Sequence, residues 1–238
     1  MSLRRDAVVL DAHDPEKVAT FWAAMLGRRR LDDARGGVLL PPTSQPGFAV
    51  RIVPGAAPKV AANRTHLDLT SATPQGQADL VATALAHGGK HIDIGQGPDA
   101  EHVVLADPEG NELCVIDPGN GFLADTGRIG AVNCDGTQRL GYFWSEALGW
   151  PLVWDQDEET AIQSALGGSK VTWSGPPLDP KHGKERLHLD VAPVDADQAT
   201  EVARLETLGA RRTDIGQGDV SWVVMVDPDG NEFCVLDS

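Results

Sequence analysis

The stretch Asp107-Pro108-Glu109-Gly110-Asn111-Glu112-Leu113-Cys114-Val115-Ile116-Asp117 returns near the end of the chain. Its second copy is Asp227-Pro228-Asp229-Gly230-Asn231-Glu232-Phe233-Cys234-Val235-Leu236-Asp237, and eight of the eleven positions are identical. Self-similarity at a fixed distance is the signature of a duplicated structural unit. Asp-Pro-x-Gly is also a good type I turn sequence, so each copy predicts a turn that joins two strands of a terminal hairpin.

Shorter matches extend the repeat upstream. They are His66-Leu67-Asp68 with His188-Leu189-Asp190, Asp93-Ile94-Gly95-Gln96-Gly97 with Asp214-Ile215-Gly216-Gln217-Gly218, and Phe21-Trp22 with Phe143-Trp144. The spacing between copies stays within 120 to 122 residues. We therefore expect two homologous domains, at 1–118 and 127–238, with a linker at 119–126, inside the segment Asp117 to Arg128 whose Gly, Pro and Asp residues suit a connection.

Composition limits the classes of protein that fit the sequence. The chain has 238 residues, enough to bury a core, and 35 acidic against 20 basic side chains give a net charge of −15. That charge repels phosphate backbones, so we expect no nucleic-acid partner. No run approaches the 18 or more apolar residues of a membrane span, and the start of the chain lacks the apolar region of a signal peptide, so no membrane partner is expected either.

The number and spacing of the cysteines indicate the cellular compartment of the protein. Cys114, Cys134 and Cys234 form neither an even set nor a Cys-x-x-Cys motif, which favours a reducing, cytoplasmic location. A small-molecule partner fits the sequence best, and a homodimer is compatible with it.

Hydrophobic periodicity predicts α+β structure in each domain. Val18, Phe21, Trp22, Met25 and Leu26 follow helical spacing, with Asp14 as the cap and Pro15 at the first helical position. A second helix is predicted from about Thr73-Pro74 to Gly88, and the counterparts of the two helices begin near Leu140 and near Asp195. Strands are predicted at 6–12, 37–40, 48–53, 65–70, 102–106 and 111–116, so each domain should contain two βαβββ modules.

Alternation along the strands predicts one polar sheet face. Leu67 and Leu69 should pack against helices, while His66 and Asp68 share the opposite face. The same alternation puts Glu112 and Cys114 on that face, and the second domain repeats it with His188, Asp190, Glu232 and Cys234. A sheet with helices on one face and these side chains on the other suggests a concave cup that can hold a small molecule or a metal.

These motifs together resemble the glyoxalase/bleomycin-resistance/extradiol-dioxygenase family, the vicinal oxygen chelate superfamily. The resemblance rests on the Phe-Trp helix, the His-Leu-Asp strand and the terminal Asp-Pro-x-Gly-Asn-Glu hairpin, and it covers nearly the whole chain twice. It implies tandem glyoxalase-like domains whose paired βαβββ modules curl into a cup-shaped mixed sheet with helices outside. Catalytic members hold Zn, Ni, Fe or Mn in this cup through His, Gln and Glu.

The resemblance carries over to the ligand positions only in part. His66 and His188 fall at a family ligand position, whereas the first-strand position falls near Ala7 and near Ile129, which cannot bind a metal. Cys114 and Cys234 stand where family enzymes have a carboxylate. The candidate metal residues are therefore His66, Glu112, His188 and Glu232, and Cys114 with Asp68 could complete a zinc-like set, because thiolate and imidazole are both good zinc ligands.

Structural roles are open for the same residues. Each histidine can instead be a hydrogen-bonded cup residue, each cysteine a small buried hydrophobe, and each glutamate a cap for backbone donors in the preceding turn. Among the tryptophans, Trp22 and Trp144 lie on helical core faces. Trp154 and Trp173 belong to the second half of the chain, near predicted strands, where flat rings could line an aromatic pocket.

The sequence thus supports two functions. The first is binding of an apolar or aromatic small molecule in a β-cup, with ligand contacts from His66, Asp68, Glu112, Cys114, His188, Asp190, Glu232, Cys234, Trp154 and Trp173. The alternative is a divalent-metal-dependent lyase, isomerase or dioxygenase of the superfamily, in which the metal would be Zn, Ni, Mn or Fe. No catalytic residue is assigned from sequence.

Overall fold

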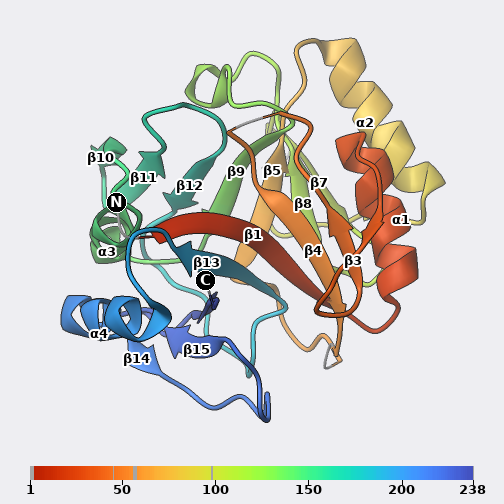
Figure 1. Ribbon diagram of the computed structural model, residues 1–238. Helices are drawn as coiled ribbons and strands as arrows, with labels where there is room; N and C mark the ends of the chain where they lie inside the picture. The colour runs from red at the N-terminus through yellow and green to blue at the C-terminus, as the bar shows by residue number, and fades with distance from the viewer. Residues whose placement is uncertain (1–2, 45, 56–57, 98, 238) are drawn as a thin grey trace.

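The structure is a computed structural model that describes residues 3–44, 46–55, 58–97 and 99–237. Four βαβββ modules follow one another along the chain (Figure 1). The first contains β1 (Leu3–Ala12), α1 (Pro15–Leu26), β2 (Leu31–Asp32), β3 (Val38–Leu40) and β4 (Ala49–Pro54). The second contains β5 (Thr65–Leu69), α2 (Pro74–Ala86), β6 (Lys90–His91), β7 (Val103–Ala106) and β8 (Glu112–Val115).

The second half of the chain repeats this order after a short 3-10 helix, η1 (Gly121–Leu123). The third module contains β9 (Ile129–Cys134), α3 (Gln138–Leu148), β10 (Leu152–Gln156), β11 (Glu159–Gln163) and β12 (Lys170–Trp173). The fourth contains β13 (Leu187–Pro193), α4 (Gln198–Leu208), β14 (Arg211–Arg212), β15 (Val223–Val226) and β16 (Glu232–Val235). The predicted strands and helices are all present, and the two-residue strands β2, β6 and β14 are additional.

Helix α1 begins and ends as its sequence predicts. The Asp14 side chain accepts a hydrogen bond from the Lys17 backbone N–H at 3.1 Å, and Pro15 occupies the first turn. Gly27 ends the helix in the left-handed conformation, with φ of 61°. Helix α4 instead begins at Gln198, three residues after the predicted start at Asp195, because Asp197 is the residue whose side chain caps it.

The modules pair crosswise between the two sequence repeats. One eight-stranded sheet has the order β14-β15-β16-β13-β1-β4-β3-β2, and the other has the order β10-β11-β12-β9-β5-β8-β7-β6. Antiparallel pairing of β1 with β13 joins the first and fourth modules, and antiparallel pairing of β5 with β9 joins the second and third. Each sheet therefore takes one module from each repeat, and the predicted α+β architecture of paired βαβββ modules is confirmed.

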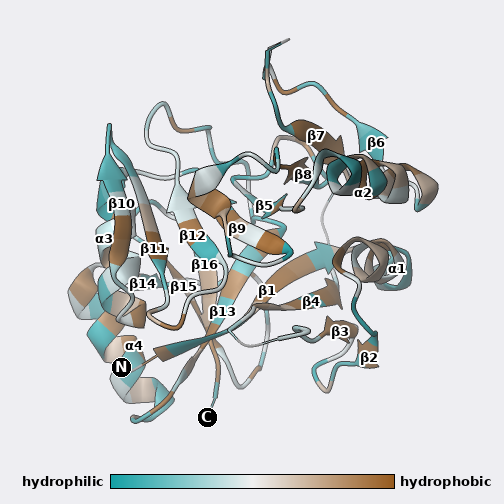
Figure 2. Ribbon diagram, turned by 90° about the horizontal axis from the view of Figure 1, so that it is seen from above, coloured by the Kyte–Doolittle hydropathy of each residue, from teal (hydrophilic) through white to brown (hydrophobic). Residues whose placement is uncertain are grey.

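The helices lie outside the sheets in two pairs. Figure 2 shows α1 and α2 on one side of the strands and α3 and α4 on the opposite side. Within each pair the two helices are in contact, so helix packing joins the modules that are neighbours in sequence. The buried apolar side chains form one continuous core that spans both halves of the chain.

A buried carboxylate joins each terminal hairpin to the helix of the preceding module. Asp107 accepts hydrogen bonds from the Glu109 and Asn111 backbone N–H groups at 2.8 and 3.0 Å and from the Asn111 side chain at 2.9 Å. Its second oxygen accepts from the Trp22 indole at 3.2 Å. The Glu109 carboxylate then receives the backbone N–H groups of His13 and Asp14, at the start of α1. Asp107 and Glu109 of the hairpin motif thus hold the turn and the start of α1 in place together.

Asp227 makes the equivalent contacts with Asn231 and with the Trp144 indole. Burial raises the pKa of Asp227 to about 6, although these hydrogen bonds oppose the shift. We expect its carboxyl carbon to titrate near this value in ¹³C NMR. Because the pKa of Asp227 in the folded protein lies above the ordinary value, its contribution to the free energy of unfolding is complete below about pH 4. That contribution is lost as the pH rises through about 6. A titration at pH 4 or below would contradict this.

Crosswise pairing also predicts how fragments behave. A fragment of residues 1–118 contains β1 and β5 but neither of their partners β13 and β9, so it should not form a monomeric cup. We expect fragments 1–118 and 127–238 to assemble into a 1:1 complex when mixed, as measured by size-exclusion chromatography and circular dichroism. A stably folded, monomeric 1–118 fragment would show that the crosswise pairing is not required.

Candidate functional site

Each eight-stranded sheet encloses a cavity on its concave face. The cavity of the first and fourth modules, here cup A, has a volume of about 370 Å³ and is lined by residues that include Val9, Arg51, His188, Asp190 and Cys234. The cavity of the second and third modules, here cup B, has a volume of about 310 Å³. Residues that line it include Asp68, Phe122, Asn133, Trp154 and Thr172.

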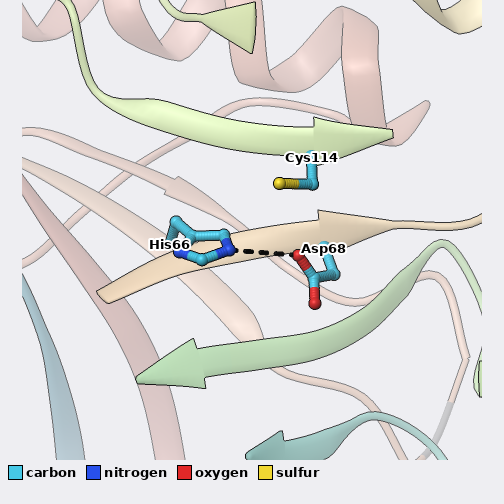
Figure 3. A group of neighbouring side chains, drawn as sticks. All are labelled: His66, Asp68 and Cys114. Atoms are coloured by element: carbon cyan, nitrogen blue, oxygen red, sulfur yellow. Dashed lines mark ion pairs between the residues drawn. The ribbon is translucent and has the colours of Figure 1, made fainter. Parts of the chain in front are cut away.

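The sheet of cup B brings three of the predicted site residues together, and Asp68 is the one of them that lines the cavity. His66 and Asp68 alternate on β5 and therefore project from the same face, and Cys114 on β8 is paired by register with Asp68. The His66 Nε2 atom lies 3.3 Å from Asp68 Oδ1. One nitrogen, one carboxylate oxygen and the sulfur of this group all lie within 4.8 Å of one another. Figure 3 shows the thiol reaching from the neighbouring strand toward the imidazole.

Cup A repeats this cluster with His188, Asp190 and Cys234. Here the His188 Nε2 atom lies 3.5 Å from Asp190 Oδ1. The other ring nitrogen, Nδ1 of His188, is buried and has no hydrogen-bond partner among the described residues. The two clusters are therefore the same three residue types in the same arrangement.

The electrostatics of both clusters favour a positive charge at the histidine. Burial alone would lower the pKa of His66, but hydrogen bonds with Asp68 and Cys114 and the charge of Asp68 raise it to about 10. The pKa of His188 is likewise raised to about 10 by Asp190 and Cys234, against the effect of burial. Each cluster is thus built around a shared cation, which can be a proton on the imidazole or a metal ion that replaces it.

The donor set fits a divalent transition metal. An imidazole nitrogen, a thiolate sulfur and a carboxylate oxygen are the three ligand types that Zn²⁺ takes in proteins, and three protein ligands leave a fourth position open, as in catalytic sites. The sulfur also disfavours Mg²⁺ and Ca²⁺, which prefer oxygen ligands. His66, Asp68 and Cys114 would hold the ion in cup B.

Glu112 and Glu232 lie outside both clusters. Glu112 pairs with Lys59 at 2.9 Å and accepts the Asn63 backbone N–H at 3.2 Å. Glu232 pairs in the same way with Lys181 and accepts the backbone N–H of Glu185. These carboxylates therefore stabilise the loops that lead into β5 and β13, rather than the turn that precedes them, and the structure places Asp68 and Asp190 at the histidines instead.

The two tryptophans predicted for the ligand site differ in exposure. The Trp154 side chain is 37% exposed, and it packs edge-to-face on Phe122 with 5.7 Å between the ring centroids. Trp173 also lines cup B, but it is only 1% exposed. Trp154 and Phe122 therefore form the accessible aromatic wall of cup B.

The polar residues that line cup B are uncharged apart from Asp68 and Glu159. The Asn133 side-chain amide donates to Asp68 Oδ2 at 3.4 Å, and Thr172 lies beside Asn133 in the register of β12 with β9. The Thr172 hydroxyl oxygen is buried and has no hydrogen-bond partner among the described residues. An unpaired buried hydroxyl costs free energy unless a ligand or water satisfies it.

Several cup residues escaped prediction from the sequence. Asn133, on β9, stands opposite His66, because that strand comes from the other repeat. Arg51 lines cup A in the same way, opposite Val9. A lone arginine inside the apolar strand sequence at 49–53 was the available signal, since a buried charge requires partners. Phe122 belongs to the segment assigned as linker, where nothing in the sequence indicated a wall of the cup.

The raised pKa of His66 leads to a direct measurement. In chelator-treated protein, ¹⁵N NMR should show His66 protonated at neutral pH and titrating only near pH 10. Because the folded pKa exceeds the ordinary 6.5, the stabilising contribution is complete below pH 6.5 and is lost as the pH rises through about 10. Asp68→Asn should lower this pKa by removing the carboxylate, whereas Glu112→Gln, outside the cluster, should leave it unchanged. A wild-type titration near 6.5 would be inconsistent with the cluster.

Comparison with known proteins identifies the family. The chain belongs to the glyoxalase-like domain family, whose model matches residues 7–116 and 130–236. The fold is similar to that of glyoxalase I from Zea mays, with a TM-score of 0.67 and 15% identity over 99% of this chain and 92% of that chain. It is also similar to a "putative dioxygenase" from Bacillus subtilis subsp. subtilis str. 168, with a TM-score of 0.63 and 14% identity over 98% of this chain and 84% of that chain.

These likenesses show the fold alone, and they agree with the vicinal oxygen chelate superfamily that the motifs indicated. Among curated proteins, no match to the chain is found. No helix in the described part of the chain is long and apolar enough to cross a membrane.

Proposed function

We propose that this protein binds an apolar or aromatic small molecule in cup B. The observation that carries the proposal is the juxtaposition of an aromatic wall, Phe122 and Trp154, with a polar floor, Asp68 and Asn133, in one cavity of about 310 Å³. Ligand pockets in proteins combine predominantly apolar walls with a few polar groups that fix orientation. Five charged side chains line cup A and only two line cup B, so cup B is the better match to an apolar ring.

The polar floor gives the ligand a preferred orientation. The unpaired Thr172 hydroxyl and the Asn133 amide can hydrogen-bond a ring substituent, and Asp68 can accept from a hydroxyl or amine. A flat ring with one polar edge would thus stack on Trp154 while its edge faces β9 and β12. Sequestration of such a molecule needs no metal and no catalytic residue.

Fluorescence tests this proposal with 2-naphthol as the probe. We expect saturable quenching of tryptophan emission in chelator-treated protein and about tenfold weaker binding for Trp154→Ala, because a lost aromatic contact is worth about 1.4 kcal/mol. The matched control is Val153→Ala, a neighbouring exposed residue of β10 that does not line the cup. Absence of saturable binding, or equal affinities for the two variants, would rule out the aromatic wall as the ligand site.

A second function is favoured by the His66, Asp68 and Cys114 cluster. In this alternative the protein is a divalent-metal-dependent lyase, isomerase or oxygenase, and a bound metal would act as a Lewis acid on substrate oxygens. The chain's own contributions would be orientation of the substrate ring by Trp154 and exclusion of water by the aromatic wall. Asp68 would hold the ion together with His66 and Cys114.

One comparison separates the two functions. Binding of 2-naphthol that is unchanged by chelation supports sequestration, whereas binding that appears only with added metal supports the enzyme. His66→Ala should abolish turnover without unfolding the protein if the alternative holds, and unchanged turnover would exclude a role for this cluster.

A further inference from the structure

The two His–Asp–Cys clusters differ in the groups that hold the aspartate. In cup A, Asp190 Oδ2 is bound by Arg51 at 2.8 Å and by Arg35 at 2.9 Å. In cup B, Asp68 has no arginine or lysine within ion-pair distance among the described residues, and its Oδ2 meets only the neutral Asn133 amide, at 3.4 Å. The same three residue types thus stand in two different electrostatic surroundings.

Strand register identifies the position responsible. Val9 is paired with His188 on one side and with Arg51 on the other. In the second sheet, Asn133 is paired with His66 on one side and with Thr172 on the other. Thr172 is therefore the structural counterpart of Arg51, two strands away from the histidine in each cup.

Arg51 is firmly held in its place. Its side chain is 10% exposed, and it also pairs with Asp33 and with Asp6. These charges raise the pKa of Arg51 although burial opposes them. The guanidinium is consequently a permanent positive charge within hydrogen-bond distance of the carboxylate that a metal would need.

A fixed cation beside a carboxylate lowers the affinity of that carboxylate for a second cation. Asp33 and Asp6 offset the charge of Arg51, but both guanidinium groups remain bound to Asp190 Oδ2, and a metal ion at that carboxylate would lie close to them in a partly buried cavity, where screening by solvent is weak. One oxygen of Asp190 is also already committed to two guanidinium groups, whereas both oxygens of Asp68 are free of strong donors other than His66.

From this difference we infer that the chain binds one divalent transition metal, of the Zn²⁺ class, in cup B through His66, Asp68 and Cys114. The matching triad of cup A binds none, because Arg51 supplies the positive charge there. This inference deepens the metal-dependent alternative described above and rests on it. It assigns the metal to cup B alone.

The test is a metal titration of the full-length chain after removal of metal by a chelator. Zn²⁺ binding is followed by calorimetry, and bound metal per chain is counted by elemental mass spectrometry after dialysis. Co²⁺ serves as the spectroscopic probe, since ligation by a thiolate produces charge-transfer absorption in the near ultraviolet. We expect one equivalent per chain and the thiolate band with Co²⁺.

Variants in the two cups distinguish the sites. Cys114→Ser and His66→Asn should remove the tight equivalent and the thiolate band, whereas Cys234→Ser and His188→Asn should leave both unchanged. Because each pair makes the same substitution in matching positions, each cup serves as the control for the other.

Introducing an arginine into cup B tests whether Arg51 is the reason that cup A binds no metal. Thr172→Arg, at the counterpart of Arg51, should weaken Zn²⁺ binding by at least 100-fold, and Thr172→Gln controls for the larger side chain without the charge. Folding of both variants is checked by circular dichroism and by thermal unfolding. Equal affinities for the two variants would show that the arginine is not what separates the cups.

The remaining outcomes fall into separate groups. Two equivalents per chain, each lost with its own cysteine, would overturn the assignment to a single cup and leave the metal-dependent alternative standing. One equivalent lost with Cys234→Ser would reverse the assignment. No tight equivalent at all would remove both the inference and that alternative, while 2-naphthol binding would still decide the sequestration proposal.

Discussion

The buried carboxylates of Asp107 and Asp227 are the contacts on which the rest of the structure depends. Each one closes a hairpin turn through backbone donors and ties that hairpin to a tryptophan on the helix of the preceding module. Removing the carboxylate would leave several buried N–H groups without an acceptor, which costs more than the hydrogen bonds themselves contribute. This requirement explains why the repeat is so closely preserved between the two halves at the turn and less so elsewhere.

Because this contact joins the two modules within each sequence repeat, the strand pairing is free to join modules of different repeats. Pairing of β1 with β13 and of β5 with β9 closes two cups, each from both repeats. The polar strand faces of the two halves therefore line different cavities. As a result, Arg51 of the first half lies beside Asp190 of the second, and Asn133 of the second half lies beside Asp68 of the first.

The modules, the boundaries of α1 and the polar face of β5 were predictable from sequence, because caps, turns and alternation act over a few residues. His66, Asp68 and Cys114 were thus placed together correctly on one sheet face. Glu112 was a candidate metal ligand in the sequence, but its carboxylate contacts Lys59 and Asn63 instead. These contacts are long-range, and no local sequence pattern contains them. Asn133 and Arg51 escaped notice for a related reason, since only the crosswise register brings them beside the histidines.

Duplication followed by a change at one register position can give two sites different chemistry without altering their ligands. A carboxylate in a partly buried cup requires a cation, and either an ion bound from solution or a neighbouring guanidinium can satisfy it. Cup A meets this requirement with the guanidinium of Arg51, which Asp33 and Asp6 hold in place. Among the described residues of cup B, the Asp68 carboxylate is paired only with the imidazolium of His66, and a metal ion can displace the proton of that imidazolium. Asp6 stands on β1 and Asp33 directly follows β2, so the two cups constrain the chain in different ways even where their triads coincide.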